Sequence, residues 1–154
     1  MRAIKIIIIC SCLFLAATSL AAAEKKIKKS DLPAAVQKTA DEQSQGATVK
    51  GYNQEVENGK TYYEVELTVN GHSKDVSMDP DGKVVEIEEE VALTSLPDAV
   101  HKGLTDQAKG GKITRVESLT KGGKLVAYEA QVVTGKKRSE IQVGPDGNPL
   151  KHKE

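Results

Sequence analysis

LPAAVQK at residues 32–38 and LPDAVHK at residues 96–102 are nearly the same segment, written twice and 64 residues apart. Further segments match after one inserted residue: YEVEL (63–67) with YEAQV (128–132), and DPDGK (79–83) with GPDGN (144–148). Self-similarity at a fixed spacing is typical of repeat architectures. The sequence therefore predicts two tandem units, residues 30–93 and residues 94–154.

Each unit opens with a helical pattern. Pro33 and Pro97 suit a first helical turn, where a missing N–H costs nothing. The following apolar residues recur at helical spacing and form one stripe. The residues just before each proline could cap the helices: Ser30 or Asp31 in the first unit, and Thr94 or Ser95 in the second.

Strand patterns follow each helix. In residues 63–69, tyrosine, valine and leucine alternate with glutamate and threonine, which is typical of a strand with one wet face. Asn58-Gly59 and Asn70-Gly71 indicate hairpin turns. We predict an α+β fold in which each unit packs one helix on one face of a three- to four-stranded antiparallel sheet. The two units could join into one larger sheet or stay separate.

The N-terminus predicts export. Residues 1–23 have a basic start, an apolar run and a small-residue end, which is the pattern of a signal peptide. An uncleaved anchor is the alternative. Residues 24–29 form a charged leader. Both cysteines, Cys10 and Cys12, precede the cleavage point, so the mature chain has none. We expect a periplasmic or secreted protein of a bacterial cell envelope, with no stable membrane insertion after cleavage.

The unit pattern LPxAVxK, then YYEVEL at residues 62–67 and DPDGKV at 79–84, resembles the PepSY-like domain family, also described as beta-lactamase-inhibitor-like. The second copy departs from the pattern, because it reads GPDGNP there. The resemblance implies an exported protein associated with restraint of peptidases. It also implies a layout of tandem helix-plus-sheet units whose concave sheet grips an enzyme. The related beta-lactamase inhibitory protein binds its enzyme with many aromatic side chains and carries disulfides. This mature chain, in contrast, has four tyrosines and no tryptophan, phenylalanine or cysteine.

No residues form a recognisable catalytic set. His72, His101 and His152 have no second histidine or cysteine at ligand spacing. No nucleophile and base can be named, so we expect no enzyme, no cofactor and no metal site. The stretch DPDGKVVEIEEE at residues 79–90 puts acids at positions 1, 3 and 12 of a calcium loop, but it lacks the ligand at position 5 and the glycine at position 6.

Acidic residues are concentrated in the first unit. Residues 31–93 carry 14 acidic and 5 basic side chains, whereas residues 94–154 carry 7 and 11. The candidate partner-binding residues alternate along two predicted strands: Tyr62, Glu64, Glu66, Glu86, Glu88 and Glu90. Tyr62 is the expected exposed anchor. These charges could simply be a solvated face that keeps the sheet soluble.

The function that these residues predict is a non-catalytic exported protein-binding module. Its open sheet face would bind an exported protein or peptide with a basic surface and could inhibit or regulate an envelope peptidase. The near-neutral total charge gives no reason to expect nucleic acid as a partner. The alternative is a calcium or small-ligand sensor or buffer that uses the acidic sheet face of the first unit.

Overall fold

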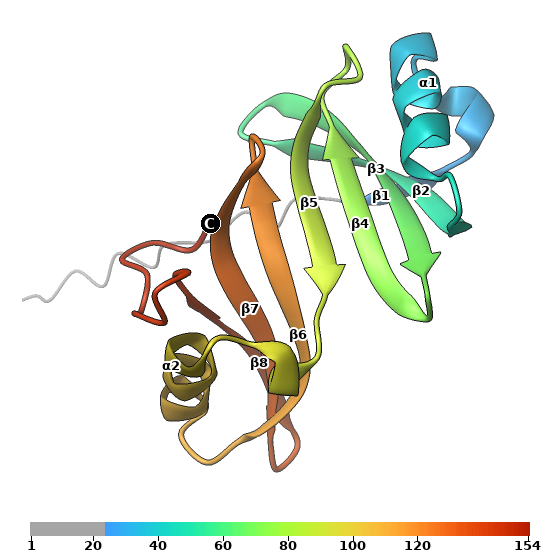
Figure 1. Cartoon of the computed structure of the whole chain (residues 1–154). Helices are drawn as coiled ribbons and strands as arrows, with labels where there is room; N and C mark the ends of the chain where they lie inside the picture. The colour runs from blue at the N-terminus through green and yellow to red at the C-terminus, as the bar shows by residue number, and fades with distance from the viewer. Residues whose placement is uncertain (1–23) are drawn as a thin grey trace, which may run out of the picture.

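The computed structural model describes residues 24–154 as one eight-stranded antiparallel sheet with two helices (Figure 1). The helices are α1 Ala34–Gln43 and α2 Asp98–Ala108, and each follows a short 3-10 turn, η1 Lys29–Asp31 and η2 Leu93–Ser95. The strands are β1 Lys25–Ile27, β2 Thr48–Glu57, β3 Lys60–Val69, β4 His72–Met78, β5 Val84–Glu90, β6 Lys112–Lys121, β7 Lys124–Thr134 and β8 Lys137–Val143. The predicted signal peptide lies outside the described residues. In residues 24–154, no helix is both long and apolar enough to cross a membrane.

The strands lie in the sheet in the same order as in the chain, from β1 to β8. The junction that matters is between β5 and β6, because it joins the two predicted units. These strands pair in register, with Glu88 opposite Leu119 and Glu90 opposite Glu117. Helix α2 lies between them in sequence, yet the sheet continues without a break. Of the two arrangements that the sequence left open, joined or separate units, the structure has the single larger sheet.

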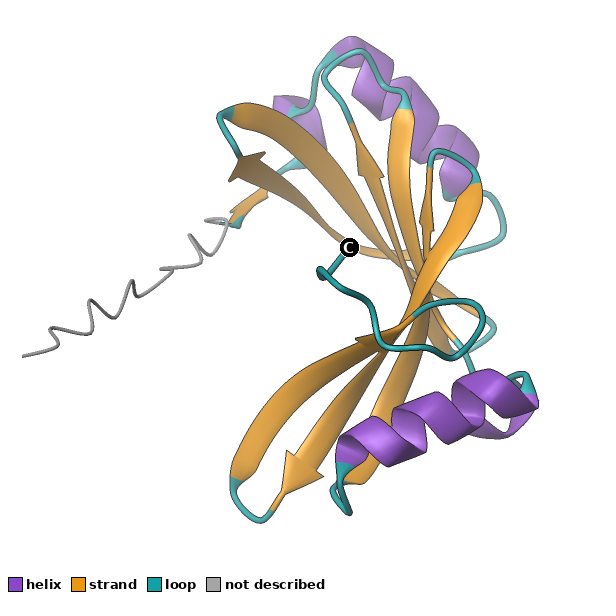
Figure 2. Ribbon diagram, turned by 90° about the vertical axis from the view of Figure 1, so that its left-hand side faces the viewer, coloured by secondary structure: helices purple, strands orange, loops and turns teal. Residues whose placement is uncertain are grey.

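Both helices cover the same face of the sheet, and each has its own apolar cluster. Val36 and Ala40 of α1 are fully buried against β3 and β4, and Val100 and Leu104 of α2 are fully buried against β6, β7 and β8. Figure 2 shows the sheet bent at its middle, with the helices on the outer side and no helix on the inner side. We call the inner, helix-free side the open face.

The turn after β4 and the turn after β8 pack on the helices in the same way. A Cβ on Gly82 would lie 2.6 Å from the carbonyl oxygen of Ala35 in α1, and a Cβ on Gly147 would lie 2.1 Å from that of Ala99 in α2. Both glycines also have positive φ. Only glycine allows this close approach, which explains the DPDG and GPDG segments.

One strand was not predicted, and one local prediction was wrong. Within the charged leader, Ile27 pairs with Tyr52 and packs against the α1 cluster, which makes β1 an edge strand. The helices are not capped by the predicted side chains, since Pro33 and Pro97 take the N-cap positions. The reason is that the preceding residues form 3-10 turns, where Asp31 accepts a hydrogen bond from the Lys28 amide at 3.1 Å and Ser95 donates to the Ala92 carbonyl at 2.8 Å.

Candidate functional site

Strand register places all six predicted partner-binding residues on the open face. Glu64 lies opposite Ser77, and Ser77 lies opposite Glu86. Glu66 lies opposite Asp75, which lies opposite Glu88 in the next strand. Their apolar neighbours point to the helices, as the period of two requires. The residues are therefore gathered on one surface, and partner binding by them stays a prediction.

The acidic surface continues into the second half of the sheet. Glu90 of β5 lies opposite Glu117 of β6, which lies opposite Glu129 of β7. The net positive charge of residues 94–154 does not describe this face, because several of the basic residues lie at turns, such as Lys136 between β7 and β8. The open face thus carries carboxylates in both halves, but in the second half Arg115 and Lys121 share the face with Glu117 and Glu129.

Three carboxylates meet at the middle of the bend, and we call Asp75, Glu88 and Glu117 the central cluster. Each places an oxygen within 4.8 Å of the other two. Burial is the main reason that the pKa of Glu88 rises to about 8, and the charges of Glu117 and other acids add to it. Burial likewise raises the pKa values of Asp75 and Glu117. Among the described residues, no hydrogen bond or ion pair engages the Glu88 side chain.

One guanidinium balances part of this charge. Arg115 Nη2 lies 2.5 Å from Glu117 Oε1 and also contacts the Ser73 hydroxyl, while Arg115 Nε lies 4.0 Å from Glu90 Oε2. The Glu117 side chain is only 7% exposed, so it depends on this partner. Glu90 accepts a 3.2 Å hydrogen bond from the Ser73 amide, which lowers its pKa. Glu90 is therefore already engaged inside the protein.

A second group of carboxylates lies at the β1 end of the open face. Glu24, Glu64 and Glu66 also place oxygens within 4.8 Å of one another, and we call them the β1 cluster. The amide of Asn53, a fully buried residue of β2, donates from Nδ2 to Glu64 at 3.0 Å and to Glu66 at 2.9 Å. Burial raises the pKa of Glu64 to about 7, although the Asn53 hydrogen bond lowers it. The β1 cluster thus holds a neutral amide where the central cluster holds an arginine.

Tyr62 lies beside a small hollow on the same face. The hollow has a volume of about 180 Å³ and is lined by Glu55, Glu57, Tyr62, Ser77, Val85, Glu86 and Lys121. Lys121 Nζ lies 3.7 Å from Glu86 Oε2. Tyr62 is partly buried rather than freely exposed, so the predicted anchor is one wall of this hollow.

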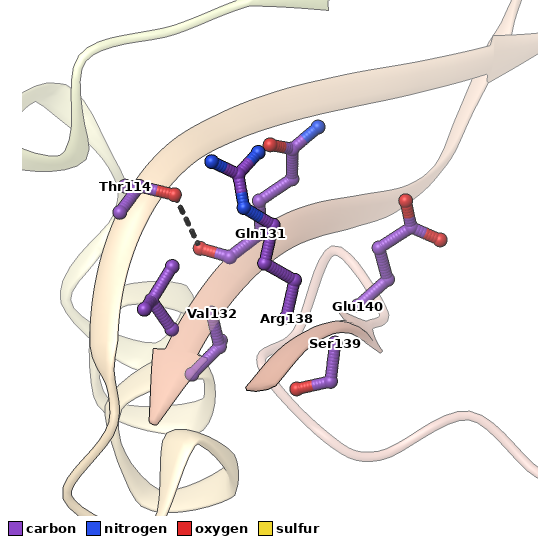
Figure 3. Close-up of a pocket in the computed structure, with 7 residues that line it drawn as sticks. Thr114, Gln131, Val132, Arg138, Ser139 and Glu140 are labelled. Atoms are coloured by element: carbon purple, nitrogen blue, oxygen red, sulfur yellow. Dashed lines mark hydrogen bonds between the residues drawn. The ribbon is translucent and has the colours of Figure 1, made fainter. Parts of the chain in front are cut away.

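A larger pocket of about 400 Å³ lies at the other end, between β6, β7 and β8 (Figure 3). Figure 3 shows Thr114 bonded to the Gln131 carbonyl oxygen, with a distance of 3.2 Å, and Arg138 and Glu140 on the rim. Ser139 also lines it, but within residues 24–154 no hydrogen bond joins this serine to a base. The pocket offers polar contacts and lacks the paired nucleophile and base of a hydrolase.

Sequence reasoning missed Asn53, Asp75, Arg115 and Glu117. Asp75 follows the alternation of β4 and could have been found from it. Glu117 and Arg115 could not, because their neighbours on β5 depend on the register across the β5–β6 junction. Asn53 gave no signal, since asparagine in a strand is read as a turn residue or as a solvent-facing one.

No family model matches the chain, and no curated protein matches it. Solved structures do match. A DUF2874 family protein from Bacteroides ovatus is 20% identical, with 78% of this chain and 85% of that chain covered and a TM-score of 0.62. A Bacteroides eggerthii protein provisionally described as periplasmic is 20% identical over 78% and 86%, with a TM-score of 0.64. A BLIP-like protein from Bacteroides fragilis is 22% identical over 77% and 83%, with a TM-score of 0.57. The chain therefore has a BLIP-like fold.

Proposed function

We propose that this chain is an exported, non-catalytic protein-binding module of a bacterial cell envelope, periplasmic or secreted, whose open face binds a partner through a basic surface. The observation that carries the proposal is Glu88, a largely buried carboxyl group at the centre of that face for which no cationic partner is found within residues 24–154. A lysine or arginine side chain from a partner would stabilise its charged form. Charge complementarity of this kind speeds and selects association.

The shape of the molecule supports the same proposal. Both helices lie on the outer side of the bend, so an open face with acidic residues from β3 to β6 remains for contact (Figure 2). The C-terminal segment lies over the β8 end of this face, where the Glu154 amide donates to Gln142 at 2.9 Å. The hollow beside Tyr62 adds a place where a polar or basic side chain of a partner could contact an aromatic ring and carboxylates together. Such a face suits a protein surface better than a small molecule, since ligand pockets for small molecules are deeper and more apolar.

The finer parts of the proposal concern origin and partner. The matching turns at Gly82 and Gly147, each packed on an alanine carbonyl, support an origin from two tandem PepSY-like units. The periplasmic description of the Bacteroides eggerthii protein supports export. The BLIP-like description of the Bacteroides fragilis protein supports a partner that is itself an exported enzyme, and we propose a peptidase.

The test is comparative capture from periplasmic extract. The site variant combines Glu86→Lys and Glu88→Lys on the open face. The control combines Glu42→Lys and Asp98→Lys at exposed positions of α1 and α2, so its net charge is the same. We expect wild type and control to recover the same partner, at a yield that falls with added salt, and the site variant to lose it. Equal recovery of the partner by all three proteins would show that the open face does not bind it.

A further inference from the structure

We propose that the outer edge of β8 is a docking site for an extended acidic peptide segment of a partner protein, which would pair with β8 as an added strand. This inference goes beyond the proposed function, which uses the open face and a basic partner surface. The two proposals depend on different residues and can therefore fail separately. When a peptide adds to a sheet edge, backbone hydrogen bonds supply affinity, and pockets for alternate side chains supply specificity.

The outer edge of β8 is open over most of its length. Among the described residues, β8 is the last strand of the sheet and pairs with β7 alone. Its far end is covered, because Gln107 of α2 donates from Nε2 to the Gln142 carbonyl oxygen at 2.9 Å and Val143 forms a bridge with Pro149. Residues 137–140, in contrast, are all exposed. An added strand therefore has room along this part of the edge.

The covered end shows which backbone groups point outward. The Gln142 carbonyl faces Gln107, and the Gly144 amide donates to the Asn148 carbonyl at 2.8 Å, both outside the β7–β8 ladder. In an antiparallel strand, the N–H and C=O of one residue point to the same edge, and residues two apart share that edge. The amides and carbonyls of Arg138 and Glu140 therefore face the open edge, where a peptide backbone can pair with them.

A hollow lies on each side of this edge. On the open face is the pocket of about 400 Å³ with Arg138 on its rim (Figure 3). On the helix-covered side, a hollow of about 500 Å³ lies between the end of α2 and β8. Ser139 lines both. Successive side chains of an added strand point to opposite faces, so they would enter the two hollows in turn.

The linings of the two hollows differ in chemistry. The hollow on the helix side includes the buried residues Ala108 and Val132 and the half-buried Ile141, so it suits an apolar side chain. The pocket on the open face presents the guanidinium of Arg138, which suits a carboxylate. The segment that fits best alternates apolar and acidic residues.

The charge around the edge also selects an acidic segment. None of the ion pairs found in residues 24–154 includes the basic residues gathered at this end of the sheet: Lys109, Lys112, Lys136, Lys137 and Arg138. Glu140, the acid on this part of β8, is paired with Lys153 at 3.8 Å. Lysines on an edge strand repel another edge of the same kind. A basic edge therefore disfavours pairing with itself and favours an acidic strand.

The experiment titrates the exported protein into a fluorescent peptide of sequence EVEVEVE and follows fluorescence anisotropy. We expect binding with a Kd below about 1 mM, and none to the peptide KVKVKVK. Lys137→Glu/Arg138→Glu should weaken binding about tenfold or more. The matched control is Lys83→Glu/Lys124→Glu, which makes the same charge change at exposed positions near the β4–β5 and β6–β7 turns and should stay within about threefold of wild type.

A second pair of variants tests strand pairing apart from charge. Glu140→Pro removes an amide that faces the open edge, and proline is tolerated on an edge strand where its N–H would face solvent. Glu140→Ala removes the same negative charge and keeps the amide. We expect the alanine variant to bind EVEVEVE at least as well as wild type and the proline variant to lose binding. In wild type, the peptide should also slow hydrogen exchange of the Arg138 and Glu140 amides.

Three results would overturn the proposal. One is no binding of EVEVEVE by wild type at about 1 mM. Another is binding without slower exchange of the Arg138 and Glu140 amides, which would mean attraction by charge without strand pairing. The third is slower exchange of these amides at high protein concentration without peptide, which would mean that a second copy of the chain occupies the edge. The exchange measurement uses wild type, so it holds even if Glu140→Pro does not fold.

Discussion

The two carboxylate clusters of the open face contain the same kind of residue but are neutralised differently. In the central cluster, Arg115 contacts Glu117 at 2.5 Å and approaches Glu90. In the β1 cluster, the group between Glu64 and Glu66 is the uncharged amide of Asn53. One cluster therefore carries a fixed internal cation, whereas the other is held by hydrogen bonds from a neutral amide.

Residue type alone does not determine how the carboxyl groups of an acidic face behave. Glu88 and Glu90 lie two residues apart on one strand and point the same way, yet their pKa values move in opposite directions. Glu90 accepts hydrogen bonds from Ser73, whereas Glu88 is buried among other acids. A carboxyl group such as Glu88, rather than one already hydrogen-bonded such as Glu90, is therefore the better candidate for contact with a partner protein.

The largest expected effect comes from removing the internal cation. Arg115→Met leaves the Glu117 carboxylate buried without a partner, so we expect a loss of about 2–4 kcal/mol in the free energy of unfolding. Urea denaturation at pH 8 measures it. The control is Arg138→Met, at an exposed position of β8, which should change the free energy by less than about 0.5 kcal/mol. Similar values for both variants would mean that Arg115 does not hold the central cluster together.

The next effect comes from the amide of the β1 cluster. Asn53→Ala removes the donor shared by Glu64 and Glu66, and we expect a loss of about 2 kcal/mol at pH 8. The pKa of Glu64 should rise further above 7, because the lost hydrogen bond lowers it in wild type. Gln54→Ala, which alters the opposite face of the same strand, is the control and should leave the Glu64 titration unchanged. An unchanged Glu64 titration in Asn53→Ala would contradict the assignment.

The smallest effect is a pH-dependent gain in stability from the substitution Glu88→Gln. A carboxyl whose pKa is raised from 4.5 to about 8 binds more protons in the folded state, so stability falls as pH rises between these values. The variant should match wild type near pH 4.5 and be more stable by about 1 kcal/mol at pH 8, after allowance for solvent screening. Glu90→Gln is the matched control with the opposite sign, because its lowered pKa makes the charged form stabilising above pH 4.5. Thermal unfolding curves recorded across pH 4–9 measure the stability changes of both variants.

Much of the fold could be predicted from local patterns. The alternation around Tyr63, Val65 and Leu67 predicted β3, and the repeated LPxAV segment predicted both helices. Asn58-Gly59 and Asn70-Gly71 predicted two hairpin turns, and all four residues have positive φ. These features depend on residues near one another in sequence. The edge strand β1 was missed because Ile27 is a single apolar residue among lysines.

The candidate site was harder to predict because it depends on register. The sequence indicated which glutamates share a face, and the structure agrees. The meeting of Asp75, Glu88 and Glu117 depends on three strands, two of them separated by α2, and on a bulge between Ser77 and Met78. A one-residue slip would turn the carboxylates to the other face. Burial of these groups, which raises their pKa values, depends on cross-strand neighbours such as Leu119 opposite Glu88 and has no local sequence signal.

The central claim is that the strand register brings the open-face carboxyl groups together and that burial among their neighbours shifts their pKa values. The measurement that tests it most directly is a ¹³C NMR titration of the glutamate side-chain carboxyls. The account predicts that Glu88 titrates at about 8 and Glu64 at about 7, with Glu90 below its usual 4.5. If instead all three titrate near 4.5, the face is an ordinary solvated surface, and the account is contradicted.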